Sequence, residues 1–227
     1  MSRILVVAAH PDDEVLGVGA TIKKMSKDHE IYILIVTDGC SSQYRGQNVE
    51  KMIAEKKVMA KKAAELLGAK DVLFGDLPDM RLDTMPHTEV NAVIERAVDE
   101  ISPEIVFTHH YGDVNLDHQM CYKSTMVATR PSTGSCVKKI YTYEVLSATE
   151  WQSSTAPHVF IPNTYVEVDD EMLDCKKQAM KTYTMEFRKY PHTRSAEAID
   201  HLAAFRGQSV GVCAAEAFCL VREVIKQ

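Results

Sequence analysis

Short, continuously apolar runs alternate with helix-patterned segments along the first two-thirds of the chain, and this alternation constrains the fold more than any other feature. The apolar runs predict five strands: Ile4–Ala9, Ile31–Thr37, Val72–Phe74, Ile105–Thr108 and Ile140–Val145. The segments between them predict helices over Asp13–Ser26, Val49–Leu67 with Gly68 as C-cap, and Glu89–Ile101. Such alternation forms right-handed βαβ units and a mainly parallel sheet. Because the runs are continuously apolar, we expect an α/β fold with helices on both faces of the sheet.

The order of the strands decides where a ligand would bind. In the order third, second, first, fourth, fifth, the C-terminal ends of the first and fourth strands flank the switch point of the sheet. The rest of the chain is less regular and predicts a strand over Phe160–Val168, a helix over Asp170–Tyr183 and a last helix from about Ala214. No internal repeat, low-complexity tract or linker divides the sequence, so we expect a single domain over residues 1–227.

The composition is that of a soluble globular protein and argues against a general nucleic-acid binder and a membrane-spanning protein. A hydrophobic content of 45% and a charged content of 26% are typical of a soluble globular chain, and the formal charge of −6 argues against a general nucleic-acid binder. No apolar run approaches the roughly 20 residues that span a bilayer, and no leader precedes the first strand. Six cysteines without a CxxC pair indicate reduced thiols. We therefore expect a cytoplasmic protein.

A cluster of polar residues follows the first expected strand directly: His10, Asp12, Asp13 and Glu14. Such groups destabilise the edge of a core unless something binds them, and a divalent metal with an activated water is the simplest partner. His10 and Asp13 are three positions apart, so one turn can aim both at one point. Asp12 would then lie beside the bound water as its proton acceptor. Glu14 favours the positive end of the following helix and can support a ligand.

A second polar group, residues 109–118, follows the fourth expected strand. Since both loops meet at one edge of the sheet, a histidine of this group can complete a His/Asp/His site. Three protein ligands with an open position define a catalytic zinc site, although the same ligand types also suit iron(II). We expect supporting or structural roles for His109 and His110, and Asp117 is a candidate helix N-cap.

The motif Ala9-His10-Pro11-Asp12-Asp13-Glu14, together with Asp113-x-Asn115-x-Asp117-His118 and the block Gly207–Phe218, resembles the PIG-L/LmbE family of zinc-dependent N-deacetylases. The resemblance extends over essentially the whole chain. It implies that His10, Asp13 and His118 bind Zn²⁺ and that Asp12 is the general base. It also implies a Rossmann-like fold with the metal site at the C-terminal ends of the first and fourth strands, and an enzyme that removes acyl groups from N-acylated amino sugars.

One position departs from the pattern of that family. Many members carry His-x-x-His, whose first histidine assists the transition state, and here this position is Asn115. An amide can donate a hydrogen bond to a developing oxyanion but cannot supply a proton. His192, in a segment that resembles an HPRS-like motif of relatives with the same Asn, is the candidate replacement, and Arg194 is a candidate partner for a substrate hydroxyl or phosphate. Such a late loop enters either its own site or that of a neighbouring subunit, so a homo-oligomer remains open.

Substrate contacts are expected from the loops around the metal, where a sugar needs polar groups for its hydroxyls and an aromatic platform for its ring. The candidates are Arg45, Asp79, Arg81, Trp151 and Arg194. The leading hypothesis is removal of an N-acetyl group from an amino sugar, nucleotide-linked and glycan-precursor compounds included, by Asp12-assisted attack of a zinc-bound water. The alternatives are another metal-dependent hydrolase, such as a phosphoesterase, and a noncatalytic sugar-binding module. Dinucleotide binding is disfavoured because the first loop lacks Gly-x-Gly-x-x-Gly.

Overall fold

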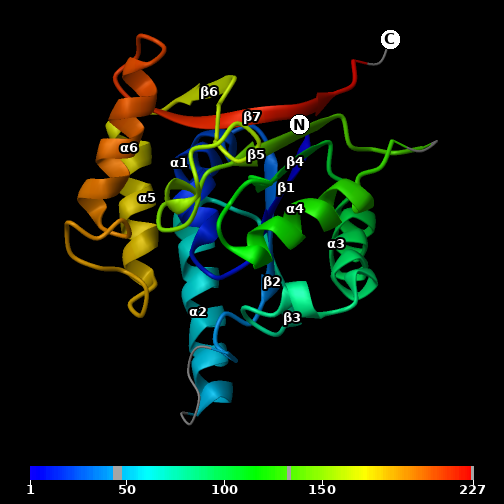
Figure 1. The fold of residues 1–227 in the computed structure, drawn as a ribbon. Coiled ribbons are helices and arrows are strands. Elements are labelled where there is room, and N and C mark those ends of the chain that lie inside the picture. Colours follow the sequence, from blue (N-terminus) through cyan, green and yellow to red (C-terminus); the bar gives the residue numbers. More distant parts are fainter. Residues whose placement is uncertain (43–47, 132–133, 226–227) are drawn as a thin grey trace.

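A seven-stranded sheet forms the centre of the computed structural model, which describes residues 1–42, 48–131 and 134–225 (Figure 1). The strand order is β3-β2-β1-β4-β5-β7-β6. The strands are β1 (Arg3–Ala8), β2 (Glu30–Thr37), β3 (Asp71–Leu77), β4 (Ile105–His109), β5 (Lys139–Tyr143), β6 (Thr164–Glu167) and β7 (Ala215–Glu223). The first five are parallel to one another, and β7 is antiparallel to β5 and to β6. The predicted order of the first five strands is therefore confirmed, and the antiparallel pair extends the sheet beyond β5.

Helices cover both faces of this sheet, as the continuously apolar strands predict (Figure 1). One face carries α1 (Asp13–Met25), α2 (Val49–Leu67), α5 (Asp170–Thr182) and α6 (Ala196–Gln208). The other face carries α3 (His87–Ile101) and α4 (Leu116–Ala128). Two short 3₁₀ turns, η1 (Leu82–Thr84) and η2 (Thr149–Trp151), lie in the connections. None of the described helices is long and apolar enough to cross a bilayer.

Capping residues define the start of α2 and α6 and the end of α2. Asn48 accepts a hydrogen bond from the backbone N–H of Lys51 at the start of α2, and Ser195 caps α6 in the same way. Gly68, with φ of 83°, ends α2 in the left-handed conformation that glycine adopts without strain. The predicted C-cap of α2 is therefore confirmed.

The secondary structure of the C-terminal part of the chain differs from the sequence prediction. The helix expected from about Ala214 is wrong, because Ala215–Glu223 is strand β7, and the last helix is α6. Alanine and glutamate favour a helix in isolation, but pairing with β5 and β6 overrides that preference. The strand expected over Phe160–Val168 is also shorter, since only Thr164–Glu167 pair with β7.

A buried ion pair holds helix α1 against α5 and β7. Lys176 of α5 donates to the carbonyl oxygen of Leu16 at 2.8 Å and pairs with Glu216 of β7 at 2.6 Å. The two carboxylate oxygens of Glu216 also accept hydrogen bonds from the backbone N–H groups of Ala20 and Thr21. A side chain at Gly19 would collide with Lys176, because its Cβ would lie 2.9 Å from Cγ of the lysine. The pair therefore fixes the helix whose first turn carries Asp13 and Glu14.

We expect Glu216→Ala to lower the free energy of unfolding by about 3–5 kcal/mol, since it leaves a buried ammonium group without its carboxylate. Urea denaturation followed by circular dichroism measures the change. The matched control is Glu223→Ala on the same strand, where the ion pair with Lys139 is partly exposed and a loss below about 1 kcal/mol is expected. Equal small losses in both variants would show that the buried pair does not hold α1.

Candidate active site

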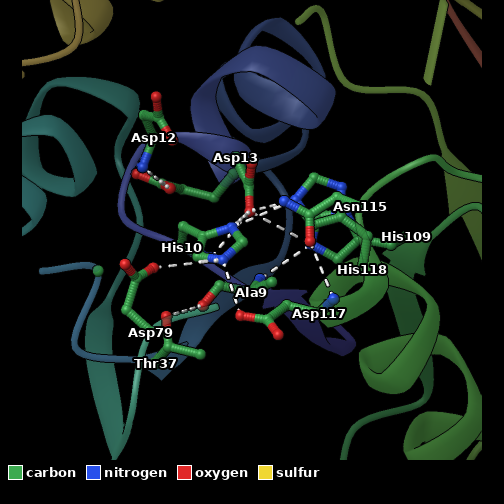
Figure 2. Close-up of polar contacts among 12 residues, drawn as sticks. Ala9, His10, Asp12, Asp13, Thr37, Asp79, His109, Asn115, Asp117 and His118 are labelled. Carbon is green, nitrogen blue, oxygen red and sulfur yellow. Dashed lines mark hydrogen bonds and ion pairs between the residues drawn. The ribbon is translucent and has the colours of Figure 1, made fainter. Parts of the chain in front are cut away.

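Three side chains from two strand-to-helix connections bring a set of metal-ligand atoms together at the edge of the sheet (Figure 2). His10 lies in the loop after β1, Asp13 is the first residue of α1, and His118 lies in the first turns of α4. Nδ1 of His10 lies 3.1 Å from Oδ2 of Asp13. Nε2 of His118 lies 3.2 Å from the same carboxylate oxygen and 3.2 Å from Nδ1 of His10. The three atoms form a nearly equilateral triangle.

The size of this triangle fits a zinc ion. Ligands at 2.0–2.1 Å from a tetrahedral zinc are about 3.3 Å apart. Two imidazoles and one carboxylate are also a usual ligand set for a catalytic zinc, which keeps one position open. Among the described residues a second group, His10 with Asp79 and Asp117, also brings ligand atoms close together. It uses the other nitrogen of the same imidazole, so we treat these carboxylates as support for His10.

Buried carboxylates face the outer nitrogens of both histidines. Nδ1 of His118 lies 3.1 Å from Oδ2 of Asp113, and that oxygen accepts a hydrogen bond from the hydroxyl of Thr149 at 2.6 Å. Nε2 of His10 lies 3.1 Å from Oδ2 of Asp117. The carboxylate of Asp117 is itself fixed by the backbone N–H groups of Met80 and Leu82. Such partners orient metal-binding imidazoles and fix which nitrogen carries the proton.

The charges at the site reinforce one another. Burial raises the pKa of Asp13, but the imidazoles of His118, His10 and His109 outweigh it and hold that pKa well below its usual range. Burial lowers the pKa of His118, whereas the carboxylates of Asp13 and Asp113 raise it to about 9. Asp13 is therefore ionised at neutral pH, as a metal ligand must be.

Asp12 occupies a strained position beside this triangle. Its φ of 122° is rare for a residue with a side chain, and strain of this kind persists only where neighbours hold it. The backbone N–H of Asp12 donates to Oε2 of Glu14, and Oε1 of Glu14 accepts the hydroxyl hydrogen of Tyr183. Burial raises the pKa of Asp12 to about 7, although Arg194 opposes the increase. The carboxylate of Asp12 is thus buried at the site and is not one of the three ligands.

A pocket runs from the triangle past Asp12 to a wall of charged residues. Its lining includes the three candidate ligands and Asp12, and also Lys56, Asn115, Ser147, Glu186 and Arg194. Nη1 of Arg194 lies 3.6 Å from Oδ2 of Asp12. Lys56 and Glu186 were not among the site residues predicted from the sequence. A signal for Lys56 was present, because this lysine belongs to the stripe of α2 that otherwise buries alanines and a leucine.

The structure brings some of the other candidate residues to the pocket and leaves others away from it. Asn115 lines it, but its Oδ1 accepts from the backbone N–H of Asp117 and so caps α4. Asn115 is therefore the N-cap, and the alternative that Asp117 caps this helix is wrong. His192 is exposed and does not line this pocket; its Nδ1 accepts the backbone N–H of Arg194.

The remaining substrate candidates that the structure describes lie outside the pocket lining. Asp79 is fully buried behind the triangle, with Oδ1 3.6 Å from Nε2 of His10 (Figure 2). Arg81 precedes η1 and is exposed, and Trp151, at the end of η2, exposes 60% of its surface. Arg45 lies outside the described residues. His109 supports the site instead, because its Nε2 accepts the backbone N–H of Ala9 and its ring stacks on that of His118.

The family model for PIG-L, described as GlcNAc-PI de-N-acetylase, matches residues 5–129. The chain is 28% identical over 188 residues to the uncharacterized deacetylase YaiS of Escherichia coli (strain K12), covering 79% of this chain and 89% of YaiS.

Two solved structures show the same fold at lower sequence identity. N,N′-diacetylchitobiose deacetylase from Pyrococcus horikoshii is 21% identical, with a TM-score of 0.77 over 97% of this chain and 84% of that chain. GalB, the 4-carboxy-2-hydroxymuconate hydratase of Pseudomonas putida KT2440, is 19% identical, with a TM-score of 0.76 over 100% and 99%. Because one is a deacetylase and the other a hydratase, the shared fold alone does not determine the reaction.

We expect Asp113→Asn to weaken zinc binding by about 10- to 100-fold, since it removes the charge that fixes the His118 imidazole. Competition with a chromophoric chelator measures the dissociation constant of the zinc complex. His87→Gln replaces an exposed histidine at the start of α3 and should leave that constant unchanged. A dissociation constant equal to that of the parent protein in Asp113→Asn would contradict the assigned support.

Proposed function

We propose that this chain removes the N-acetyl group of an N-acetylglucosamine-containing metabolite. The premise is that the chain belongs to the PIG-L family and is a deacetylase, an amide hydrolase of N-acetylated sugar compounds. Nucleotide-linked sugars and glycan precursors are the forms we would test first. The observation that carries this proposal is the His10–Asp13–His118 triangle at one end of a pocket, with the carboxylate of Asp12 beside it. The description of the family model supports the choice of sugar.

The residues that would hold the metal are His10, Asp13 and His118. A zinc ion bound there would polarise the carbonyl group of the amide and lower the pKa of a water molecule, which is the chemistry that amide hydrolysis needs. We take zinc rather than iron(II) because the resemblance to the family implies zinc, and the size of the triangle is compatible with that choice.

Asp12 is the group that moves the proton in this proposal. Its carboxylate takes a proton from the attacking water while the new carbon–oxygen bond forms. As the carbon–nitrogen bond breaks, the same carboxyl group returns that proton to the leaving amine. A base of this kind contributes typically about 10²- to 10⁴-fold to the rate. The strained backbone of Asp12, held through Glu14, keeps the carboxylate beside the triangle.

Two further pocket residues contact the substrate in this proposal. The amide nitrogen of Asn115 donates a hydrogen bond to the oxygen on which negative charge develops, since its Oδ1 already caps α4. The guanidinium of Arg194, which also lines the pocket, contacts a hydroxyl or phosphate group of the substrate. His192 is exposed beside Arg194, so its predicted catalytic role requires a neighbouring subunit; that role, a homo-oligomer and a cytoplasmic location stay predictions.

We expect the zinc-loaded protein to release amine and acetate from at least one member of a panel of free, lipid-linked and nucleotide-linked N-acetylglucosamine compounds. On that substrate Asp12→Asn should lower kcat by about 10²- to 10⁴-fold, because an amide cannot accept the proton. Amine release is measured by fluorescent derivatisation, and bound zinc by elemental analysis.

Asp76→Asn is the matched control, because Asp76 lies at the surface in an ion pair with Lys57 and away from the pocket. It should leave kcat unchanged. The absence of amine release across the whole panel would contradict the proposed function. Activity of Asp12→Asn within threefold of the parent protein would instead contradict only the role of Asp12.

A further inference from the structure

A line of alternating charges leads from helix α2 to Asp12 along the wall of the pocket. Nζ of Lys56 lies 2.8 Å from Oε1 of Glu186, and Oε2 of Glu186 accepts a hydrogen bond from Nη1 of Arg194. The same Nη1 lies 3.6 Å from Oδ2 of Asp12. These residues come from α2, the segment after α5, the loop before α6 and the loop after β1. The line thus joins four separate segments of the chain at one pocket.

The first pair of this line is deeply buried. The side chains of Lys56 and Glu186 expose only 4% and 8% of their surface. Removing such a pair from water opposes folding, and apolar side chains of similar volume often stabilise a protein more. The other buried residues of α2 include Ala60, Ala63 and Leu67, which are apolar. An apolar side chain at position 56 would therefore suit the core better than a lysine. Stability alone therefore gives little reason for this charge pair beside a pocket.

Lys56 and Glu186 also tie their neighbours to the pocket wall. Besides its ion pair, Lys56 donates to the carbonyl oxygen of Gly39 at 2.6 Å. Gly39 has a φ of 65°, and a Cβ there would lie 2.5 Å from Cδ of Pro11, next to the metal-binding loop. Glu186 uses one oxygen for Lys56 and the other for Arg194, so its carboxylate joins the two cations.

Arg194 is held from two sides. Its Nε donates to the hydroxyl of Ser147 at 2.8 Å, and its Nη1 donates to Glu186. A guanidinium is planar, so partners at two of its nitrogens fix its orientation as well as its position. The side chain exposes 29% of its surface and lines the pocket, where a substrate can reach it.

We propose that Glu186 and Lys56 are positioning residues, which hold the guanidinium of Arg194 between Asp12 and the substrate. This inference rests on the proposed deacetylase function. Glu186 acts through Arg194 and does not touch the substrate; Lys56 acts through Glu186. The specificity of the pocket on this side then depends on a residue of α2 that lies 138 positions before Arg194 in the sequence.

A double-mutant cycle on the zinc-loaded protein tests this chain of contacts. The variants are Glu186→Gln, Arg194→Ala and the double substitution, with kcat/KM measured per zinc-loaded site on the best substrate of the panel. Glu186→Gln should lower kcat/KM by roughly 10- to 100-fold through misplacement of the guanidinium. In the Arg194→Ala background the same change should alter kcat/KM by less than about twofold, since the group it positions is gone. Bound zinc should remain at one ion per chain in all variants.

The matched control removes a similar charge pair elsewhere. Glu144 forms two hydrogen bonds to the guanidinium of Arg206, at 2.7 and 2.6 Å, and neither residue lines this pocket. Glu144→Gln should leave kcat/KM unchanged. A merely structural role for Glu186 would lower the folded fraction while kcat/KM per zinc-loaded site stayed the same, which would overturn the proposal.

Two further outcomes are decisive. If the effects of Glu186→Gln and Arg194→Ala multiply in the double variant, the residues act independently and the proposal is wrong. If Glu186→Gln does not fold, Arg194→Lys is measured instead. A lysine ammonium keeps the positive charge but cannot donate to both Ser147 and Glu186 as the guanidinium does, so we expect kcat/KM to fall about tenfold. An unchanged kcat/KM would overturn the proposal. An inactive parent protein would instead contradict the proposed function.

Discussion

One carboxylate oxygen, Oδ2 of Asp13, is the point on which the rest of the site depends. It accepts the backbone N–H of His10 at 2.8 Å and lies 3.1 Å from Nδ1 of the same residue and 3.2 Å from Nε2 of His118. These contacts join the loop after β1 to the start of α4, more than 100 residues later in the sequence. The three nitrogen and oxygen ligands can meet there only because β1 and β4 are neighbours in the sheet.

The surrounding fold keeps the carboxylate of Asp13 in place with several buried charged side chains. Helix α1, which begins with Asp13, is held at its middle by Lys176 and Glu216. At its start, Tyr183 and Glu14 fix the backbone N–H of Asp12 and so the strained turn before the helix. Asp113 and Asp117 complete the arrangement from the side of the histidines. Most of the buried ionic groups named here therefore serve to orient one short segment.

The alternation of strands and helices in the sequence predicts the parallel centre of the sheet, whereas His118 is named as the third candidate ligand only by the resemblance to the PIG-L/LmbE family. Continuously apolar strands indicate that helices cover both faces of the sheet, and with the first and fourth strands as neighbours the polar residues that follow them converge. The prediction for the C-terminal part of the chain is wrong because pairing with β5 and β6 makes Ala215–Glu223 a strand, although its residues favour a helix in isolation. Of the charged group Lys56, Glu186 and Arg194, only Arg194 was predicted from the sequence, since the contacts among the three form only in the tertiary structure.

The most direct test of the account is X-ray absorption at the zinc edge of the zinc-loaded protein, because the whole scheme depends on His10, Asp13 and His118 as ligands. If these three residues bind the metal, the spectrum will show only nitrogen and oxygen ligands at about 2.0–2.1 Å, with scattering from two imidazole rings. In His118→Ala the scattering of one ring should be lost. Sulfur ligands at about 2.3 Å, or an unchanged spectrum in the variant, would show that the metal binds elsewhere.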